Sequence, residues 1–257
     1  MKTSFEHLGQ VGADPVVRRV TASRIAAWLA AGWRDLKANP LPSLAYGLLF
    51  ALGGDLIILA LLGTPHLLTV SISGFFLVAP LLAAGLYELS RKTESGEKIL
   101  FIDSLKCFSR NGQSLAIFGL ILALVTLLWE RFSAVAFALI GATSAPLASV
   151  YLNEILFSGE HLAFTATWLV LGGALALFVY ALAVVSVPLM LDRDSDFVTA
   201  MLTSLQAFTT KTGVLLLWAA TIVALTLLGF ATLLFGLVVI MPILGHASWH
   251  AYRDLVE

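Results

Sequence analysis

The sequence is short of charged side chains. Asp, Glu, Lys and Arg make up only 12% of its 257 residues, whereas a soluble globular domain carries about a quarter. Hydrophobic residues make up 59%, and the mean hydropathy is +0.94. A chain of this composition has too little polar surface to cover a globule in water. The composition therefore predicts an integral membrane protein.

Other scarcities exclude further classes. The chain has a single cysteine, Cys107, which excludes an internal disulfide and a thiolate cluster. The net charge of −1 gives no basic surface for a nucleic-acid partner. The first 40 residues hold no apolar core of signal-peptide type, so we expect no cleaved targeting segment. A nucleophile elbow, a phosphate loop and a dinucleotide fingerprint are all missing, so we expect neither an enzyme nor a bound cofactor.

Long apolar runs predict an all-α membrane protein with six transmembrane helices. A helix needs about 20 residues to cross the roughly 30 Å of hydrocarbon in a bilayer. The stretch from Gly213 to Trp249 has no charged residue and would extend about 55 Å as one helix. It is therefore expected to turn between Gly229 and Gly236 and to form helices five and six. The four runs before it are Leu41–Leu62, Leu67–Leu89, a run that begins with Ser114–Trp129, and Phe164–Leu191.

The basic residues predict the orientation of these helices. With six spans, 14 of the 15 Lys and Arg residues fall on one side of the membrane, and only Arg131 falls on the other. Because positive charges are enriched in cytoplasmic loops, both termini are predicted to be cytoplasmic. An odd number of helices would place these Lys and Arg residues on both sides of the membrane. We therefore expect a multi-pass membrane protein, with the lipid bilayer as its first partner.

A weak threefold internal repeat divides the chain into units of about 21–90, 98–191 and 197–253. Each unit holds an amphipathic stretch, a polar or glycine break, an apolar helix, and an apolar helix with a proline. This order predicts three cytoplasmic interfacial helices. By domain, 1–40 is a cytoplasmic segment with an amphipathic helix, and 41–257 is the membrane domain. The amphipathic stretches are Ile25–Lys37, Ile99–Arg110 and Phe197–Thr210, the breaks are Asn39-Pro40, Asn111-Gly112 and Thr212-Gly213, and the prolines are Pro80, Pro188 and Pro242.

The long connection from Glu130 to about Ala163 is expected on the outer side. Its two apolar pieces, Phe132–Ala142 and Leu147–Phe157, are too short to span, so we expect helices that lie on or dip into the outer leaflet. In an alternative interpretation, Phe132–Ala142 extends the third helix.

Asp55 lies inside the first predicted span. A carboxylate in hydrocarbon costs about 2.5–3.5 kcal/mol on insertion scales, so Asp55 should face protein or water. It is a candidate for transport of a proton or cation, or for contact with a partner subunit. The structural alternative, which we favour, is a protonated or hydrogen-bonded carboxyl near the outer end, where Gly53 and Gly54 allow a close neighbour.

His246 and His250 form the second candidate site. Residues four apart lie one above the other on a helix, so the two imidazoles could share a metal or one could ligate a haem. Asp254 continues the face and could orient His250. A metal usually takes three or four protein ligands, and His66 and His161 are expected on the other side of the membrane. We therefore favour an interfacial helix end, at which Trp249 and Tyr252 anchor in the headgroups.

The closing block Pro242-Ile243-Leu244-Gly245-His246-Ala247-Ser248-Trp249-His250-Ala251-Tyr252-Arg253-Asp254-Leu255 carries a resemblance. With the chain from Ile25 onward, it resembles a bacterial family of predicted integral membrane proteins of unknown function, some of which are labelled cytochrome-oxidase-subunit-like. The resemblance implies a location in the bacterial inner membrane and a helical membrane architecture, and no established activity. An oxidase core needs many histidines for its haems and copper, whereas this chain has five.

Three functions follow as hypotheses. The leading one is a non-enzymatic accessory or scaffold subunit of a membrane complex, because the predicted spans hold few polar groups. The second is a small-solute or ion transporter that uses Asp55. The third is a haem or metal protein that uses His246 and His250.

Overall fold

The structure, a computed structural model, describes residues 17–61, 74–75, 79–139, 162–232 and 234–256, apart from Arg19. Within these residues the fold is helical, with turns and one isolated antiparallel bridge between Val17 and Val256. Residues 63–66 between the first two predicted spans, part of the predicted second span, and the outer piece Leu147–Phe157 lie outside the described residues.

The helices fall into a short set and a long set. The short helices are α1 (Arg24–Ala38), α4 (Ala84–Glu94), α5 (Phe101–Ser104), α6 (Cys107–Arg110), α10 (Ser186–Arg193) and α11 (Phe197–Thr210). The long helices are α2 (Pro40–Leu61), α7 (Gly112–Leu139), α9 (Leu162–Ala183), α12 (Thr212–Ala231) and α13 (Leu237–Leu255).

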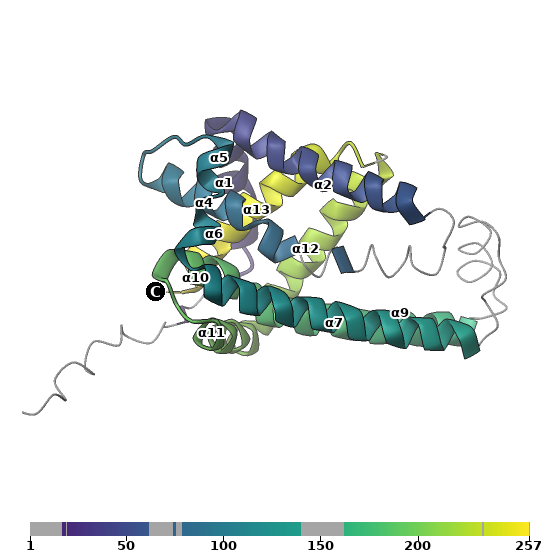
Figure 1. Cartoon of the computed structure of the whole chain (residues 1–257). Helices are drawn as coiled ribbons and strands as arrows, with labels where there is room; N and C mark the ends of the chain where they lie inside the picture. The colour runs from purple at the N-terminus through teal and green to yellow at the C-terminus, as the bar shows by residue number, and fades with distance from the viewer. Residues whose placement is uncertain are drawn as a thin grey trace, which may run out of the picture.

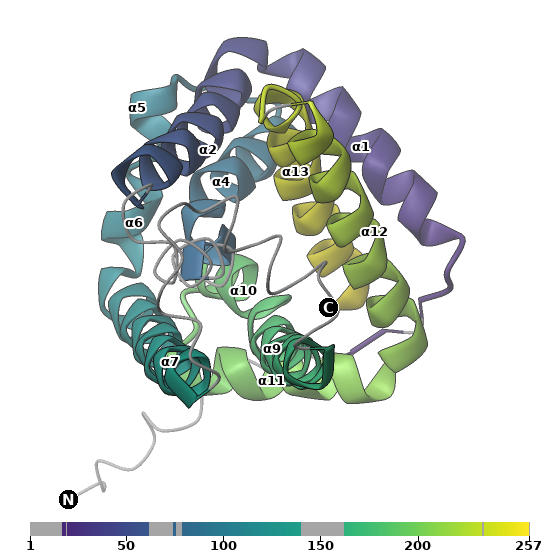
Figure 2. The ribbon, with the colours of Figure 1, turned by 90° about the vertical axis from the view of Figure 1, so that its right-hand side faces the viewer.

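The short helices gather at one end of the molecule, and α2, α7 and α9 extend away from that end (Figure 1). Viewed along α7 and α9, the helices form a ring (Figure 2). The main-chain N–H of Arg18 donates to the carbonyl oxygen of Leu255 at 2.8 Å, next to the Val17–Val256 bridge. The chain therefore enters the described fold and leaves it at the same end.

Four segments among the described residues are long and apolar enough to cross a membrane. They are Pro40–Ile57, Gly112–Ala136, Leu162–Arg193 and Thr212–Ala231, which agree with the first, third, fourth and fifth predicted helices. The predicted second helix is only partly described. The C-terminal helix α13 is not among the four. The all-helical membrane class is thus confirmed, and four of the six expected spans are found among the described residues.

Two predicted boundaries need correction. Helix α7 continues without a break through Phe132 to Leu139, so the first outer piece extends the third helix and does not lie as a separate helix on the leaflet. The predicted fourth helix is divided at Val184 and Val185 into α9 and α10. Pro188 stands two residues into α10, where its missing N–H costs no helical hydrogen bond.

The predicted amphipathic segments are helical. Helix α1 covers the first and α11 coincides with the third, whereas the second is split into α5 and α6. The chain breaks after them with nearly the same backbone angles: φ and ψ are −130° and 65° at Asn39, −127° and 47° at Asn111, and −124° and 34° at Lys211. Each break turns the chain into a long apolar helix. The third break therefore lies one residue before its predicted place.

Glycines allow α13 to pack closely against α1 and α2. A Cβ atom added at Gly32 of α1 would lie 2.5 Å from the carbonyl oxygen of Ile243, and one added at Gly47 of α2 would overlap the carbonyl oxygen of Val238. Only glycine allows such close backbone approach. Trp28 and Trp218 fill the space beside α13 with an edge-to-face ring contact at 5.6 Å between centroids. Helix α13 is thus held rigidly in the centre of the short helices.

Candidate functional site

The two histidines of α13 do lie together, in the half of the helix that packs among the short helices. His246 is fully buried, at 0% exposure. His250 is partly exposed, one turn closer to the C-terminus. Ser43, which contacts His246, belongs to the first turn of α2. The pair therefore lies at the edge of the candidate spans, beside the charged helix ends.

Both ring nitrogens of His246 are hydrogen-bonded to serines. Nε2 lies 2.9 Å from the hydroxyl of Ser43, and Nδ1 lies 2.8 Å from the hydroxyl of Ser90 on α4. One imidazole thereby joins α2, α4 and α13.

Asp35 is the centre of this polar cluster. It lies on the buried face of α1 and is only 7% exposed. Its Oδ2 accepts a hydrogen bond from the hydroxyl of Ser90 at 2.6 Å and lies 2.9 Å from Nε2 of His250. The carboxylate therefore ties α1 to α4 and α13, and a buried charge is expected to be paired in this way.

The hydrogen bonds assign the proton on His246. A serine hydroxyl has one proton, and that of Ser90 goes to the carboxylate of Asp35, the stronger acceptor. Nδ1 of His246 must then donate to Ser90. Nε2 lies 2.9 Å from the hydroxyl of Ser43, whose single proton also has the carbonyl oxygen of Asn39 as an acceptor at 2.7 Å. Burial lowers the pKa of His246 to about 4, against a smaller opposite effect of Asp35 and a small lowering by His250. The buried imidazole is thus neutral, with a serine hydroxyl at each ring nitrogen.

Charged groups extend the cluster to the surface. Nδ1 of His250 lies 3.6 Å from Glu94, whose other oxygen lies 3.5 Å from Arg253. Arg253 also reaches Asp192 at 3.2 Å, which accepts a hydrogen bond from Tyr252 at 2.7 Å. Two carboxylates, two basic groups and one phenol from three helices, α4, α10 and α13, thus contact one another.

The predicted role of Asp254 is wrong. Its carboxylate accepts hydrogen bonds from Arg24 at 2.8 and 2.9 Å and from the indole of Trp28 at 2.6 Å. The helical spacing placed Asp254 on the correct face of α13. Helix α1 lies against the end of α13, however, and its side chains hydrogen-bond this carboxylate in place of His250. Asp35 on that same helix is the residue that orients His250.

Sequence reasoning missed Asp35, although the signal was present. The apolar face of α1 is marked by Ile25, Trp28, Gly32 and Leu36. Asp35 lies seven residues after Trp28 and three after Gly32, which places it on that same face. An acidic residue at a buried helical position predicts a buried partner.

Asp55 is separate from the cluster. It lies on α2, three turns beyond Ser43, and is partly buried. A group of three or more His, Cys, Asp or Glu residues placed to bind a metal is not found in the described part of the chain. A metal on His246 would have to displace one of its two serines. Metal binding by His246 and His250, and transport through Asp55, stay predictions.

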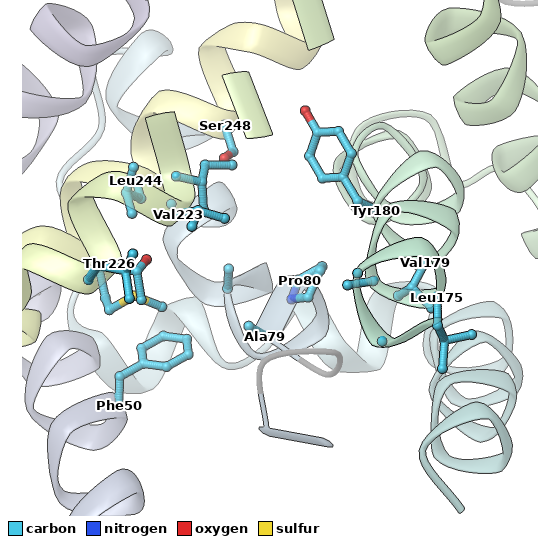
Figure 3. Close-up of a pocket in the computed structure, with 18 of the residues that line it drawn as sticks. Phe50, Ala79, Pro80, Leu175, Val179, Tyr180, Val223, Thr226, Leu244 and Ser248 are labelled. Atoms are coloured by element: carbon cyan, nitrogen blue, oxygen red, sulfur yellow. The ribbon is translucent and has the colours of Figure 1, made fainter. Parts of the chain in front are cut away.

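A second feature is an apolar cavity of about 560 Å³ between α9, α12 and α13. Its lining holds no charged side chain, and Asp55 is not part of it. Figure 3 shows Leu175 and Val179 on one side of the space, and Val223 and Thr226 on the other. Leu244, Gly245 and Ser248 of α13 close it, on the side of that helix away from His246 and His250.

The comparisons with known proteins concern the middle of the chain. Residues 67–192, just under half of the chain, match a family described as "Predicted integral membrane protein (DUF2189)". No curated protein and no solved structure matches the chain. The predicted resemblance to a family of integral membrane proteins of unknown function is confirmed, although the matched region ends before the closing block in which we found it. The family's description names no oxidase.

Proposed function

We propose, from the premise that this chain is an integral membrane protein of the family matched over residues 67–192, that it is a non-enzymatic accessory or scaffold subunit of a membrane complex. The observation that carries the proposal is the closed polar cluster. Asp35, His246 and His250 bond to helices of the same chain, so they hold the short helices together as a rigid unit. A catalytic or transport site would instead present such groups to a cavity.

The surface of this unit supports a role in association. Val198, Leu202 and Leu205 of α11 follow one another at spacings of four and three, and they are 45%, 62% and 36% exposed. On a helix these positions form one stripe. An exposed apolar stripe on a rigid helix favours contact with a partner or with the membrane surface.

The proposal includes the complete topology. Six spans, with both termini in the cytoplasm of a bacterium, agree with the basic residues and with a chain that begins and ends its described fold at one end. The similar backbone angles at Asn39, Asn111 and Lys211 support three repeated units. Thiol labelling of single cysteines introduced at Ser109 and Phe235, in intact cells and after lysis, tests the orientation.

The test of function is purification of the tagged chain from its native membrane in a mild detergent, with mass spectrometry of the chains that co-purify. A stoichiometric partner supports the proposal. A homogeneous lone species that binds or moves a solute saturably would contradict it. Leu202→Glu should reduce recovery of the partner, whereas Gln206→Glu adds the same charge at an exposed polar position of α11 and should not.

The transport hypothesis receives no comparable support. It needs a polar path to Asp55, and the cavity between α9, α12 and α13 is apolar and does not include that residue. Asp55→Asn tests it directly in a flux assay with the purified chain in vesicles. Optical absorption and metal analysis of the same preparation test the haem and metal hypothesis.

A further inference from the structure

The cavity between α9, α12 and α13 has the chemistry of a hydrocarbon site. Its volume of about 560 Å³ lies within the usual range for small-molecule pockets. Aliphatic and aromatic side chains, with glycines, make up nearly all of its lining, and charged side chains take no part in it. A ligand inside this space must therefore be apolar over most of its length, because an unpaired buried charge would be very costly.

The mouth of the cavity faces the membrane. Three lining side chains at its edge are largely exposed: Leu169 of α9 at 55%, Val223 of α12 at 57% and Leu227 of α12 at 59%. Both helices belong to the candidate spans. In a bilayer these exposed side chains contact lipid, so a lipid chain can enter between them sideways without passing through water.

Trp129 carries a buried hydrogen-bond donor beside the cavity. Its side chain lines the cavity from the second half of α7, is 6% exposed, and lies against the ring of Trp168 with 5.4 Å between ring centroids and 33° between the ring planes. The indole N–H of Trp168 donates to Ser133 at 3.1 Å. The buried indole N–H of Trp129, in contrast, finds no acceptor among the described residues. A buried donor of this kind favours a ligand that brings an acceptor.

We propose that this cavity binds one acyl chain of a membrane phospholipid, and that the ester carbonyl at the head of the chain accepts the hydrogen bond of Trp129. The acyl chain then extends from Trp129 past Val179 and Val223 toward Ser248. Trp129 and Trp168 lie in the distal halves of their helices, toward the level of the ester groups at which tryptophan is enriched. The charged headgroup stays outside, which agrees with the uncharged lining. This inference does not depend on the accessory-subunit proposal.

Ala176 offers a direct way to fill the site. It lies in the middle of the lined face of α9 and is exposed toward the space. Ala174, two residues away, is also exposed but lies on the opposite face of the helix, outside the lining. Ala176→Phe places a ring in the path of the acyl chain, and Ala174→Phe adds the same ring to the lipid-facing surface.

The experiment is native mass spectrometry of the full chain reconstituted with phosphatidylethanolamine and phosphatidylglycerol and then released from detergent. We expect one phospholipid retained per wild-type chain. Ala176→Phe should reduce the retained fraction at least fivefold, and Ala174→Phe should leave it unchanged. Trp129→Phe removes one hydrogen bond and should weaken retention by about fivefold.

The results that overturn the proposal are equally clear. They are equal retention by wild type and Ala176→Phe, no retained phospholipid on the wild type, or retention of added oleate in place of phospholipid. If Ala176→Phe does not fold, as judged by gel filtration and circular dichroism, the Trp129→Phe result and the oleate competition decide the matter.

Discussion

Nε2 of His250 lies 2.9 Å from Oδ2 of Asp35, although 215 residues separate them in the chain. The same carboxylate accepts a hydrogen bond from the hydroxyl of Ser90. The oxygen of that hydroxyl in turn accepts a hydrogen bond from Nδ1 of His246. One acidic side chain on α1 therefore organises both histidines of α13. Because the hydrogen bonds cross between helices at every step, the cluster fixes the mutual positions of α1, α2, α4 and α13.

Loss of the Asp35 carboxylate should destabilise the protein. Asp35→Ala removes two charge-assisted hydrogen bonds and leaves Ser90 and His250 without their acceptor. Such losses cost about 2–4 kcal/mol, which corresponds to a Tm lower by roughly 5–10 °C in a chain of this size. The measurement is thermal unfolding in detergent. Asp103→Asn, at a half-exposed carboxylate paired with Lys106, is the control and should change the Tm little. Equal shifts for the two variants would contradict the central role of Asp35.

The stability should fall in mild acid because of His246. Its pKa is lowered to about 4 in the folded chain and is about 6.5 when the chain unfolds. The unfolded state then binds the proton more strongly. Stability is complete above about pH 6.5 and falls as the pH drops toward 4, by up to about 3 kcal/mol.

His246→Gln isolates this effect. The variant should be less stable at neutral pH but should lose less stability than the wild type between pH 6.5 and 4. Unfolding midpoints of both proteins, measured over that interval, give the comparison. Parallel curves for the two would mean that His246 does not titrate as its burial requires.

The close packing of α2 on α13 should be intolerant of a methyl group at Gly47. Its Cβ would overlap the backbone of Val238, which cannot move aside as a flexible side chain can. Gly47→Ala should destabilise the chain by about 1–3 kcal/mol, the usual cost of overpacking. Gly213→Ala is the matched control, because an added Cβ there meets no neighbour within 4 Å. It should be neutral or slightly stabilising, since alanine favours helix. Thermal unfolding of both variants distinguishes a packing effect from a general effect of glycine replacement.

Cys107 should react slowly with thiol reagents. It is 2% exposed on α6, and burial raises the pKa of its thiol to about 12. The reactive thiolate is therefore very rare near neutral pH. We expect maleimide to label it only after denaturation. The double variant Cys107→Ser with Ser109→Cys, which moves the thiol to an exposed position of the same short helix, should label rapidly. Rapid labelling of native Cys107 would show that α6 opens readily from the core.

Parts of the site were within reach of the sequence, and others were not. The face shared by His246 and His250 follows from a spacing of four residues. The burial of Asp35 follows from the apolar face of α1, had that face been searched for acidic residues. Ser43 and Ser90 carry no such signal, because isolated serines occur in many apolar helices. Their role depends on which helices meet at His246, and that is a property of the tertiary structure.

The sequence by itself determined the membrane class and the amphipathic helices α1 and α11. It also determined the chain breaks at Asn39 and Asn111 and the turn between Gly229 and Gly236. These features are local, since they depend on hydropathy and on helix-breaking residues within a short stretch. The tertiary structure alone decided that Asp254 contacts Arg24 and Trp28, that Asp35 joins the histidines, and that an apolar cavity remains beside Trp129. Those features arise where helices distant in the chain come together, and their positions depend on packing that no local pattern records.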